Sequence, residues 1–165
     1  MAHVRDVMPL YAPTVNSYKR YVDASWAPTR VAWSVDNRTA GFRIVGDGAS
    51  RRVECRIPGA DCNPYLALAV QLAAGLDGLR HEIDPGPPVD TNVWELSEEE
   101  RARYGMETLP ANLFEAVEEL SADRVLREAL GEHIYRNYTS AQKKEWAEYI
   151  AQVTEWELDK YLATY

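Results

Sequence analysis

Three short strand-like runs follow one another between residues 31 and 57, and most of the remaining sequence is helical in pattern. The runs cover residues 31–35, 40–45 and 51–57, and we expect short antiparallel strands there. Gly46-Asp47-Gly48 marks a hairpin turn between the second and the third. Three short strands make a small sheet for a chain of 165 residues. The sequence therefore predicts an α+β fold whose sheet is part of a larger one and whose C-terminal part is mostly helical.

The clearest helix signal follows the third strand. Asn63 is a good N-cap, Pro64 suits the first helical position, and the apolar pattern continues to about His81. Residues 83–110 are rich in proline, glycine and acidic residues, which is typical of a long surface connection. The predicted helices cover residues 14–22, 64–81, 111–120, 121–131 and 140–161.

Charge is distributed unevenly along the chain. The net charge is -8, yet the first 60 residues hold nine basic residues against five acidic ones. The strongly acidic remainder argues against a nucleic-acid surface, and no apolar run reaches membrane-spanning length. The start of the chain does not resemble a signal peptide, and the two cysteines, Cys55 and Cys62, are too few for a disulfide framework or a zinc site. We therefore expect a cytoplasmic protein with free thiols and no membrane partner.

The third strand carries an alternating charge pattern. Because side chains of a strand point to opposite faces in turn, Arg52, Glu54 and Arg56 share one face. Val53, Cys55 and Ile57 share the other face, which we expect to pack on the core. The charged face alone fits a salt-bridged surface as well as it fits a binding site.

Further arginines occur near this strand, each of them single in the sequence. Arg20 ends the first predicted helix, Arg38 lies between two strands, and Arg43 lies on the second strand. Separated arginines suit discrete anions such as phosphate and carboxylate, and a glutamate among them can ligate Mg²⁺. The combination points to ATP-driven activation of a carboxylate without defining the reaction.

Several motifs, taken in order along nearly the whole chain, resemble one family. These are Pro13-Thr14-Val15-Asn16-Ser17-Tyr18-Lys19-Arg20, Asp36-Asn37-Arg38-Thr39, Arg52-x-Glu54-x-Arg56, Asn63-Pro64-Tyr65-Leu66, Ala73-Ala74-Gly75-Leu76-Asp77-Gly78, Lys144-Glu145-Trp146 and Val153-Thr154-Glu155-Trp156-Glu157. In this set the chain resembles class I glutamine synthetases. It is most similar to the γ-glutamylpolyamine and γ-glutamylamide synthetases in Ala27-Pro28-Thr29, in Asp36-Asn37-Arg38-Thr39 and in Gly59-Ala60-Asp61. Residues 1–165 match the C-terminal part of the family's catalytic domain.

The resemblance implies an ATP-dependent ligase that converts glutamate into γ-glutamyl phosphate and couples it to an amine. It implies ATP and Mg²⁺ or Mn²⁺ as cofactors, with the metal ions neutralising phosphate charge. By position, Arg20 and Arg56 resemble the arginines that hold glutamate. The resemblance gives Arg20 a catalytic role as well.

The remaining matched side chains resemble the nucleotide and metal site of the family. Arg38 and Arg43 correspond to arginines on the transferring phosphate, and Arg38 is also implied to be catalytic. Arg52 corresponds to an arginine that contacts ATP. Glu54 corresponds to the glutamate that ligates the metal near the nucleotide.

Two positions depart from the family pattern. Ammonia-using members carry a glutamate immediately before an Ala-Pro pair, where this chain has Trp26. Tryptophan cannot accept a proton, but its ring can line a pocket for a larger amine. Where regulated bacterial members have a tyrosine that is adenylylated, this chain has Trp94, which lacks a hydroxyl group.

The resemblance also implies what this chain lacks. The family's N-terminal β-grasp domain and the first half of its catalytic domain, with most metal ligands, have no counterpart in these residues. We therefore expect the chain alone to be inactive and to need the missing catalytic half or neighbouring subunits, since the family forms homo-oligomers. Two alternatives stay open: an ammonia-using glutamine synthetase, and a non-catalytic module kept for binding or assembly.

Overall fold

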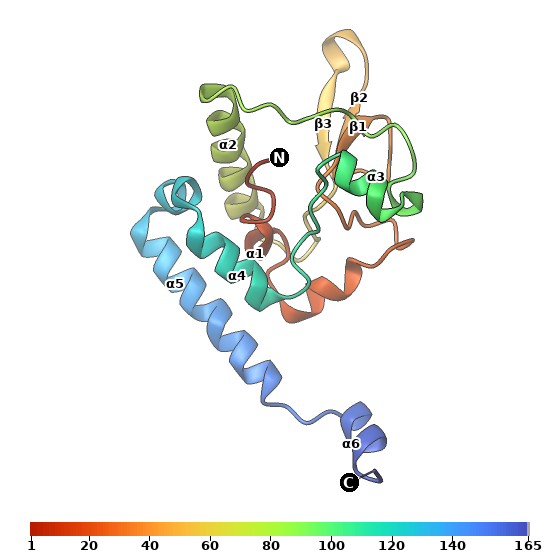
Figure 1. The fold of residues 1–165 in the computed structure, drawn as a ribbon. Helices are drawn as coiled ribbons and strands as arrows, with labels where there is room; N and C mark the ends of the chain where they lie inside the picture. The colour runs from red at the N-terminus through yellow and green to blue at the C-terminus, as the bar shows by residue number, and fades with distance from the viewer. Residues whose placement is uncertain (165) are drawn as a thin grey trace.

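A small sheet and a group of helices lie side by side in the computed structural model, which describes residues 1–164 (Figure 1). The sheet contains β1 (Trp33–Val35), β2 (Phe42–Val45) and β3 (Arg52–Cys55). The helices are α1 (Met8–Tyr11), α2 (Pro64–Arg80), α3 (Glu98–Arg103), α4 (Leu113–Ala122), α5 (Arg124–Ile150) and α6 (Glu155–Tyr161). Three short 3₁₀ helices, η1 (Val15–Arg20), η2 (Gly48–Ser50) and η3 (Val93–Glu95), complete the described elements. This arrangement confirms the predicted α+β class.

The strands are in the order β1-β2-β3, but only one of the two pairs is antiparallel. β2 and β3 form the predicted hairpin, with Arg43 opposite Glu54. β1 and β2 run parallel, so the expectation of antiparallel strands was wrong for this pair. The segment between them turns back on itself, starting at Asp36, whose φ of 51° lies in the left-handed region. A parallel pair requires the chain to reverse direction twice within residues 36–41, and the residue pattern did not indicate this.

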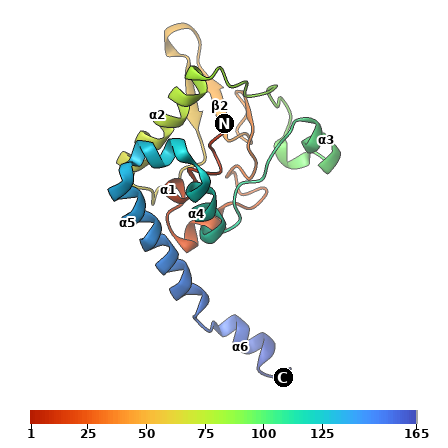
Figure 2. The same ribbon diagram turned by 60° about the vertical axis from the view of Figure 1, so that its left-hand side comes forward.

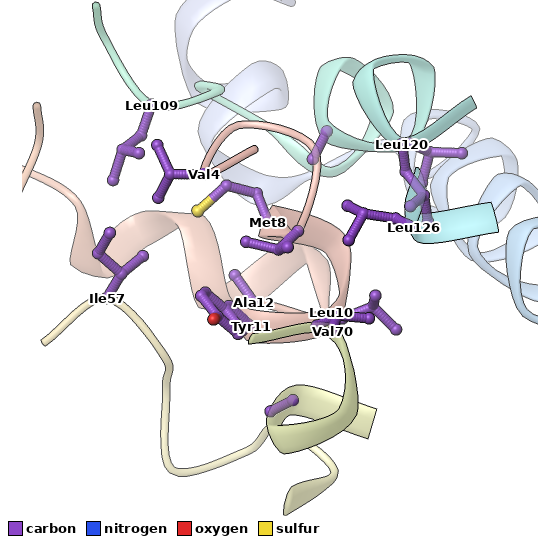
Figure 3. Close-up of a cluster of buried hydrophobic side chains, with 14 of the residues drawn as sticks. Val4, Met8, Leu10, Tyr11, Ala12, Ile57, Val70, Leu109, Leu120 and Leu126 are labelled. Atoms are coloured by element: carbon purple, nitrogen blue, oxygen red, sulfur yellow. The ribbon is translucent and has the colours of Figure 1, made fainter. Parts of the chain in front are cut away.

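The main hydrophobic core lies between α1, α2, α4 and α5 (Figure 3). Met8, Leu113, Leu120 and Leu126 are fully buried in it. The N-terminal segment runs through the centre of this core and places α1 against α2 and α4. The sheet joins the core through Ile57, which is 0% exposed and lies just after β3.

The face opposite the charged residues of β3 is only partly covered. We expected Val53, Cys55 and Ile57 to be buried together, and this was wrong for Val53, which is 60% exposed. Cys55 is half-buried against the core. The β2–β3 hairpin projects past the helices (Figures 1 and 2), and Val53 lines an open cavity of about 210 Å³ between the hairpin, the N-terminal segment and α2.

The helices of the C-terminal part differ from the prediction in where they break. α4 matches the segment predicted at 111–120, and α5 begins as expected near 121. Gly131, with φ 71°, kinks α5 where the predicted helix ends, but the helix continues to Ile150. The single helix expected over 140–161 was wrong, because the chain leaves α5 and restarts as α6 behind the N-cap Thr154. α6 lies beyond the end of α5 and away from the sheet (Figures 1 and 2).

The helix α2 begins as predicted, with the Asn63 side chain accepting hydrogen bonds from two backbone amides of the first turn. His81 is its C-cap residue. Only Ala67 and Val70 of α2 are buried, whereas its outer face is apolar and open. That face carries Tyr65, Leu68, Leu72, Leu76 and Leu79. Among residues 1–164, no helix is both long and apolar enough to span a membrane.

Candidate functional site

Glu54 lies between two arginines on the charged face of the hairpin. Its Oε2 accepts a hydrogen bond from Arg43 at 3.1 Å, and its Oε1 lies 3.3 Å from Nε of Arg56. The first contact joins cross-strand partners, and the second joins residues two apart on one strand face. The structure therefore brings Glu54 and Arg56 together on one face, as strand alternation predicts.

The positive charge of this cluster exceeds its negative charge. Asp36 hydrogen-bonds Arg43 and raises the pKa of its guanidinium, so Arg43 stays charged. Burial lowers the pKa of Arg56; Glu54 opposes this, while the charges of Arg43 and Arg38 add to it. Within the described residues, Nε of Arg43 and Nη1 of Arg56 are buried without a hydrogen-bond partner. Unused donors in a positive environment favour a bound anion.

An open groove of about 740 Å³ runs beside the sheet and contains all three of the predicted phosphate-binding residues. Arg38, Arg43 and Arg52 all line it, together with Arg51. Asp47, which also lines the groove, lies 3.9 Å from Arg51. Residues from the β1–β2 turn and from both strands of the hairpin thus form one basic surface.

A second open groove of about 800 Å³ adjoins the first and contains Trp26. The two grooves share Arg38 and Arg43 in their walls. The second also includes Asn37, whose side-chain amide donates to the backbone carbonyls of Val89 and Thr91, both at 2.8 Å. These bonds attach the turn at residues 36–39 to the long connection before η3. The predicted amine-pocket residue therefore lies next to the predicted phosphate-binding residues.

Trp26 occupies an exposed loop position with an unusual backbone conformation. Its φ is 64°, in the left-handed region that a bulky residue rarely adopts, and 64% of the residue is exposed. The ring meets that of Trp94 edge to face, with 5.5 Å between centroids. Arg56 donates to the Trp26 carbonyl at 3.4 Å. Trp94 and Arg56 thus connect this loop to η3 and to the end of β3.

Sequence reasoning assigned Trp94 only the loss of a modifiable hydroxyl and did not place it at the site. In the structure its ring is the direct neighbour of Trp26. The indole Nε1 of Trp94 is buried without a partner among the described residues. A second tryptophan in a polar segment was the one sequence feature that could have pointed to Trp94. Residues 26 and 94 are too far apart in sequence for a local pattern to predict their contact.

Arg20 lies at the edge of the cluster and not in either groove. Its guanidinium packs over the ring of Tyr21 at 4.7 Å and donates to the carbonyl of Ile57, the residue after Arg56. The Tyr21 hydroxyl donates to the same carbonyl at 2.9 Å. Arg20 therefore lies beside the backbone that follows Arg56, and its side chain is engaged in the fold.

The described residues do not form a complete metal site at Glu54. Both of its oxygens face guanidinium groups, and it is not part of the one group of possible ligands that residues 1–164 bring together. The carboxylate of Asp36, which also reaches Arg43, is bound to that guanidinium. A divalent cation needs several oxygen ligands, so Glu54 can supply only part of such a set.

Comparison with known proteins gives a consistent result. The family model described as "Glutamine synthetase, catalytic domain" matches residues 1–161. The glutamine synthetase of Thermus thermophilus is 45% identical over 166 aligned residues, which are all of this chain and 37% of that protein. The Halobacterium salinarum protein of the same name is 49% identical over 151 residues, 91% of this chain and 33% of that protein.

Solved structures of GmaS are similar along almost the whole chain. The structure described as "Apo GmaS without ligand" has a TM-score of 0.84 and 38% identity, and the match covers 98% of this chain and 36% of that one. The structure described as "GmaS/ADP complex-Conformation 1" gives a TM-score of 0.85 at 38% identity, covering 98% of this chain and 37% of that one. The chain thus spans little more than a third of the length of these relatives. It belongs to the glutamine synthetase family and matches that family's catalytic domain.

Proposed function

We propose that this chain is part of an ATP-dependent glutamate–amine ligase that activates glutamate as γ-glutamyl phosphate. The observation that carries the proposal is the arginine-lined groove beside the sheet, joined to the groove of Trp26, in a chain of this family. Phosphoryl transfer requires positioned positive charge for the phosphate oxygens, and the groove concentrates it.

The residues divide between two substrates. Arg38, Arg43 and Arg52 hold phosphate oxygens of ATP from the walls of the groove. Arg56, with its buried unpartnered Nη1, holds the glutamate carboxylate, and Arg20 supports it from beside the Ile57 carbonyl. One of the similar GmaS structures is an ADP complex, which supports a nucleotide at this fold. Mg²⁺ or Mn²⁺, when bound, neutralises phosphate charge, and Glu54 contributes one of its ligands.

Trp26 selects the amine. The loop position before Ala27-Pro28 has an aromatic ring and no proton acceptor, so it offers little help to ammonium, which must lose a proton before attack. The ring can cover the methylene groups of an organic amine, and its face attracts an alkylammonium group. The ring of Trp94 packs against that of Trp26 edge to face. We therefore infer that an organic amine, such as a polyamine or ethanolamine, is the preferred acceptor.

The chain acts together with further parts of a glutamine synthetase catalytic domain. It spans 36–37% of the GmaS chains that it matches, and Glu54 alone cannot hold the nucleotide metal. We propose that residues 1–165 correspond to the C-terminal part of that domain. The remaining metal ligands then come from other sequence or from neighbouring subunits of a homo-oligomer.

A chimaera tests the proposal. Residues 1–164 replace the matching segment of the Thermus thermophilus glutamine synthetase, and phosphate release is measured with ATP, glutamate and each amine. We expect glutamate-dependent and amine-dependent phosphate release, which Arg56→Gln abolishes. Arg124→Gln does not abolish it, because the Arg124 side chain is exposed at the start of α5. An assembled chimaera without any such activity would contradict the proposal.

An ammonia-using glutamine synthetase is the second candidate. Eight similar curated proteins carry the name glutamine synthetase and are 41–49% identical, against 38% for the two GmaS structures. The amine assay separates the two candidates, because only the second predicts ammonia as the best acceptor.

A further inference from the structure

Three possible metal ligands converge on the helical side of the molecule, beside the main core and not at the arginine groove. His3 and Asp6 come from the N-terminal segment, and Asp123 comes from the junction of α4 and α5. Their ligand atoms lie within 4.8 Å of one another. His3 Nδ1 is 2.6 Å from Oδ2 of Asp123 and 4.0 Å from Oδ2 of Asp6. The side chains of His3, Asp6 and Asp123 are 14%, 19% and 7% exposed.

Neighbouring groups fix the orientation of these side chains. Nε2 of His3 is 2.9 Å from Oδ2 of Asp77, near the C-terminal end of α2, which leaves Nδ1 facing the two other carboxylates. Asp77 is also 3.0 Å from the ring of His81. Oδ1 of Asp123 accepts from the Leu126 amide at 3.0 Å as the N-cap of α5, which leaves Oδ2 for the cluster. A carboxylate behind a histidine is the arrangement that orients a histidine ligand toward a metal.

The charge of this cluster is not balanced by lysine or arginine. Asp6, Asp77 and Asp123 form ion pairs only with the two imidazoles among residues 1–164. Arg5, next to Asp6 in sequence, turns instead to Glu119 and to the Thr108 carbonyl. The cationic partners of these largely buried carboxylates among residues 1–164 are therefore imidazoles alone, and a divalent ion that displaces the shared protons would neutralise the carboxylates.

We propose that His3, Asp6 and Asp123 bind one divalent transition-metal ion of the Zn²⁺ class. One imidazole nitrogen and two carboxylate oxygens suit Zn²⁺, with a water molecule in the fourth position. Bonds of about 2.1 Å in a tetrahedral site separate the ligand atoms by about 3.4 Å. The Nδ1–Oδ2 pair of His3 and Asp123, now at hydrogen-bond distance, therefore opens slightly on binding.

The position of this site assigns it a structural role. An ion there ties the N-terminal segment to the α4–α5 junction, and through Asp77 to α2. These are the segments that form the main core. The site shares no residue with either groove of the proposed ligase site. The inference is therefore independent of the proposed function.

Calorimetric titration of the untagged chain with Zn²⁺ tests the site. We expect one Zn²⁺ per chain, and affinity at least 10-fold weaker in His3→Gln, Asp6→Asn and Asp123→Asn. The asparagine at 123 keeps the helix cap, so the last variant removes charge with little change to the fold. Asp77→Asn weakens binding about 10- to 100-fold through the orientation of His3.

His133→Gln is the matched control, because His133 is exposed on the surface of α5 and is not part of the cluster, and its ring has a hydrogen-bond contact only with Asn137 among residues 1–164. The Zn²⁺ affinity of His133→Gln stays within about 2-fold of that of the unmodified chain. Zn²⁺ also raises the melting temperature of the unmodified chain but not of Asp123→Asn. No binding at 1 mM Zn²⁺, equal weakening by His133→Gln, or unchanged binding in both aspartate variants would overturn the site.

Discussion

Ile57 anchors the charged strand to the core, so its truncation gives a sharp test of the packing. It is 0% exposed, and its Cδ1 lies so close to Gly41 that an added Cβ there would approach it to 3.0 Å. Its backbone carbonyl also accepts the hydrogen bonds of Arg20 and Tyr21. We expect Ile57→Ala to lower the free energy of unfolding strongly.

The magnitude follows from the buried volume that is lost. The substitution removes three carbon atoms, which at about 0.8 kcal/mol each is about 2.4 kcal/mol before any cavity term. If the neighbouring side chains do not fill the cavity that is left, the total loss in the free energy of unfolding is about 3–4 kcal/mol. Val53→Ala removes two carbons on the same strand face, but the residue is 60% exposed, so the loss is about 0.6 kcal/mol.

Urea unfolding of the two variants beside the unmodified chain, followed by tryptophan fluorescence, measures both values. We expect Ile57→Ala to lower the free energy of unfolding about five-fold more than Val53→Ala does. This ratio is the decisive quantity, because the two side chains alternate to the same side of the chain and differ in burial. Equal losses, or a larger loss for Val53→Ala, would show that the hairpin packs on the helices along its whole length and would refute packing through its base alone.

Two further predictions concern the helical side. In EDTA, we expect Asp6 and His3 both to make the free energy of unfolding fall as pH rises. Burial and Asp123 raise the pKa of Asp6 from 3.8 to about 7 in the folded chain. The protonated carboxyl of Asp6 therefore contributes its full stabilisation below pH 3.8, and this contribution is lost as pH rises through 7. The pKa of His3 is also raised, because its hydrogen bonds to Asp123 and Asp77 outweigh burial. Asp6→Asn therefore flattens the decline between about pH 4 and pH 7 in denaturant unfolding, and an unchanged slope refutes this. We expect the exposed leucines of α2 to make the chain self-associate at micromolar concentration. The double variant Leu68→Gln, Leu72→Gln should then lower the mass measured by sedimentation towards 18.7 kDa, and an unmodified chain that is monomeric at about 100 µM contradicts the prediction.

Local patterns predicted those parts of the fold that short-range physics determines. The Asn63-Pro64 start of α2 and the β2–β3 hairpin depend on capping and turn chemistry within a few residues. The parallel pairing of β1 with β2 depends on a tight double reversal that no residue pattern specified. The exposure of Val53 depends on how far the hairpin extends past the helices, which is a tertiary property.

The candidate site was predicted to a similar degree. Strand alternation placed Glu54 and Arg56 together, and the family resemblance added Arg38 and Arg43, which the structure brings into one groove with Arg52. The contact of Trp26 with Trp94 joins segments that are distant in sequence, so pattern reasoning could not find it. The cluster around His3 combines three separate segments and was missed for the same reason.

The amine preference of the assembled chimaera tests the central claim most directly. The ratio of kcat/KM for ethanolamine to kcat/KM for ammonia is compared between the chimaera and its Trp26→Glu variant. We predict that the chimaera prefers ethanolamine, and that Trp26→Glu shifts the ratio towards ammonia by about 2- to 30-fold, the range of a cation–π contact of about 0.5–2 kcal/mol. A preference for ammonia in the chimaera, with the same ratio in the Trp26→Glu variant, would contradict the assignment of Trp26 to the amine pocket.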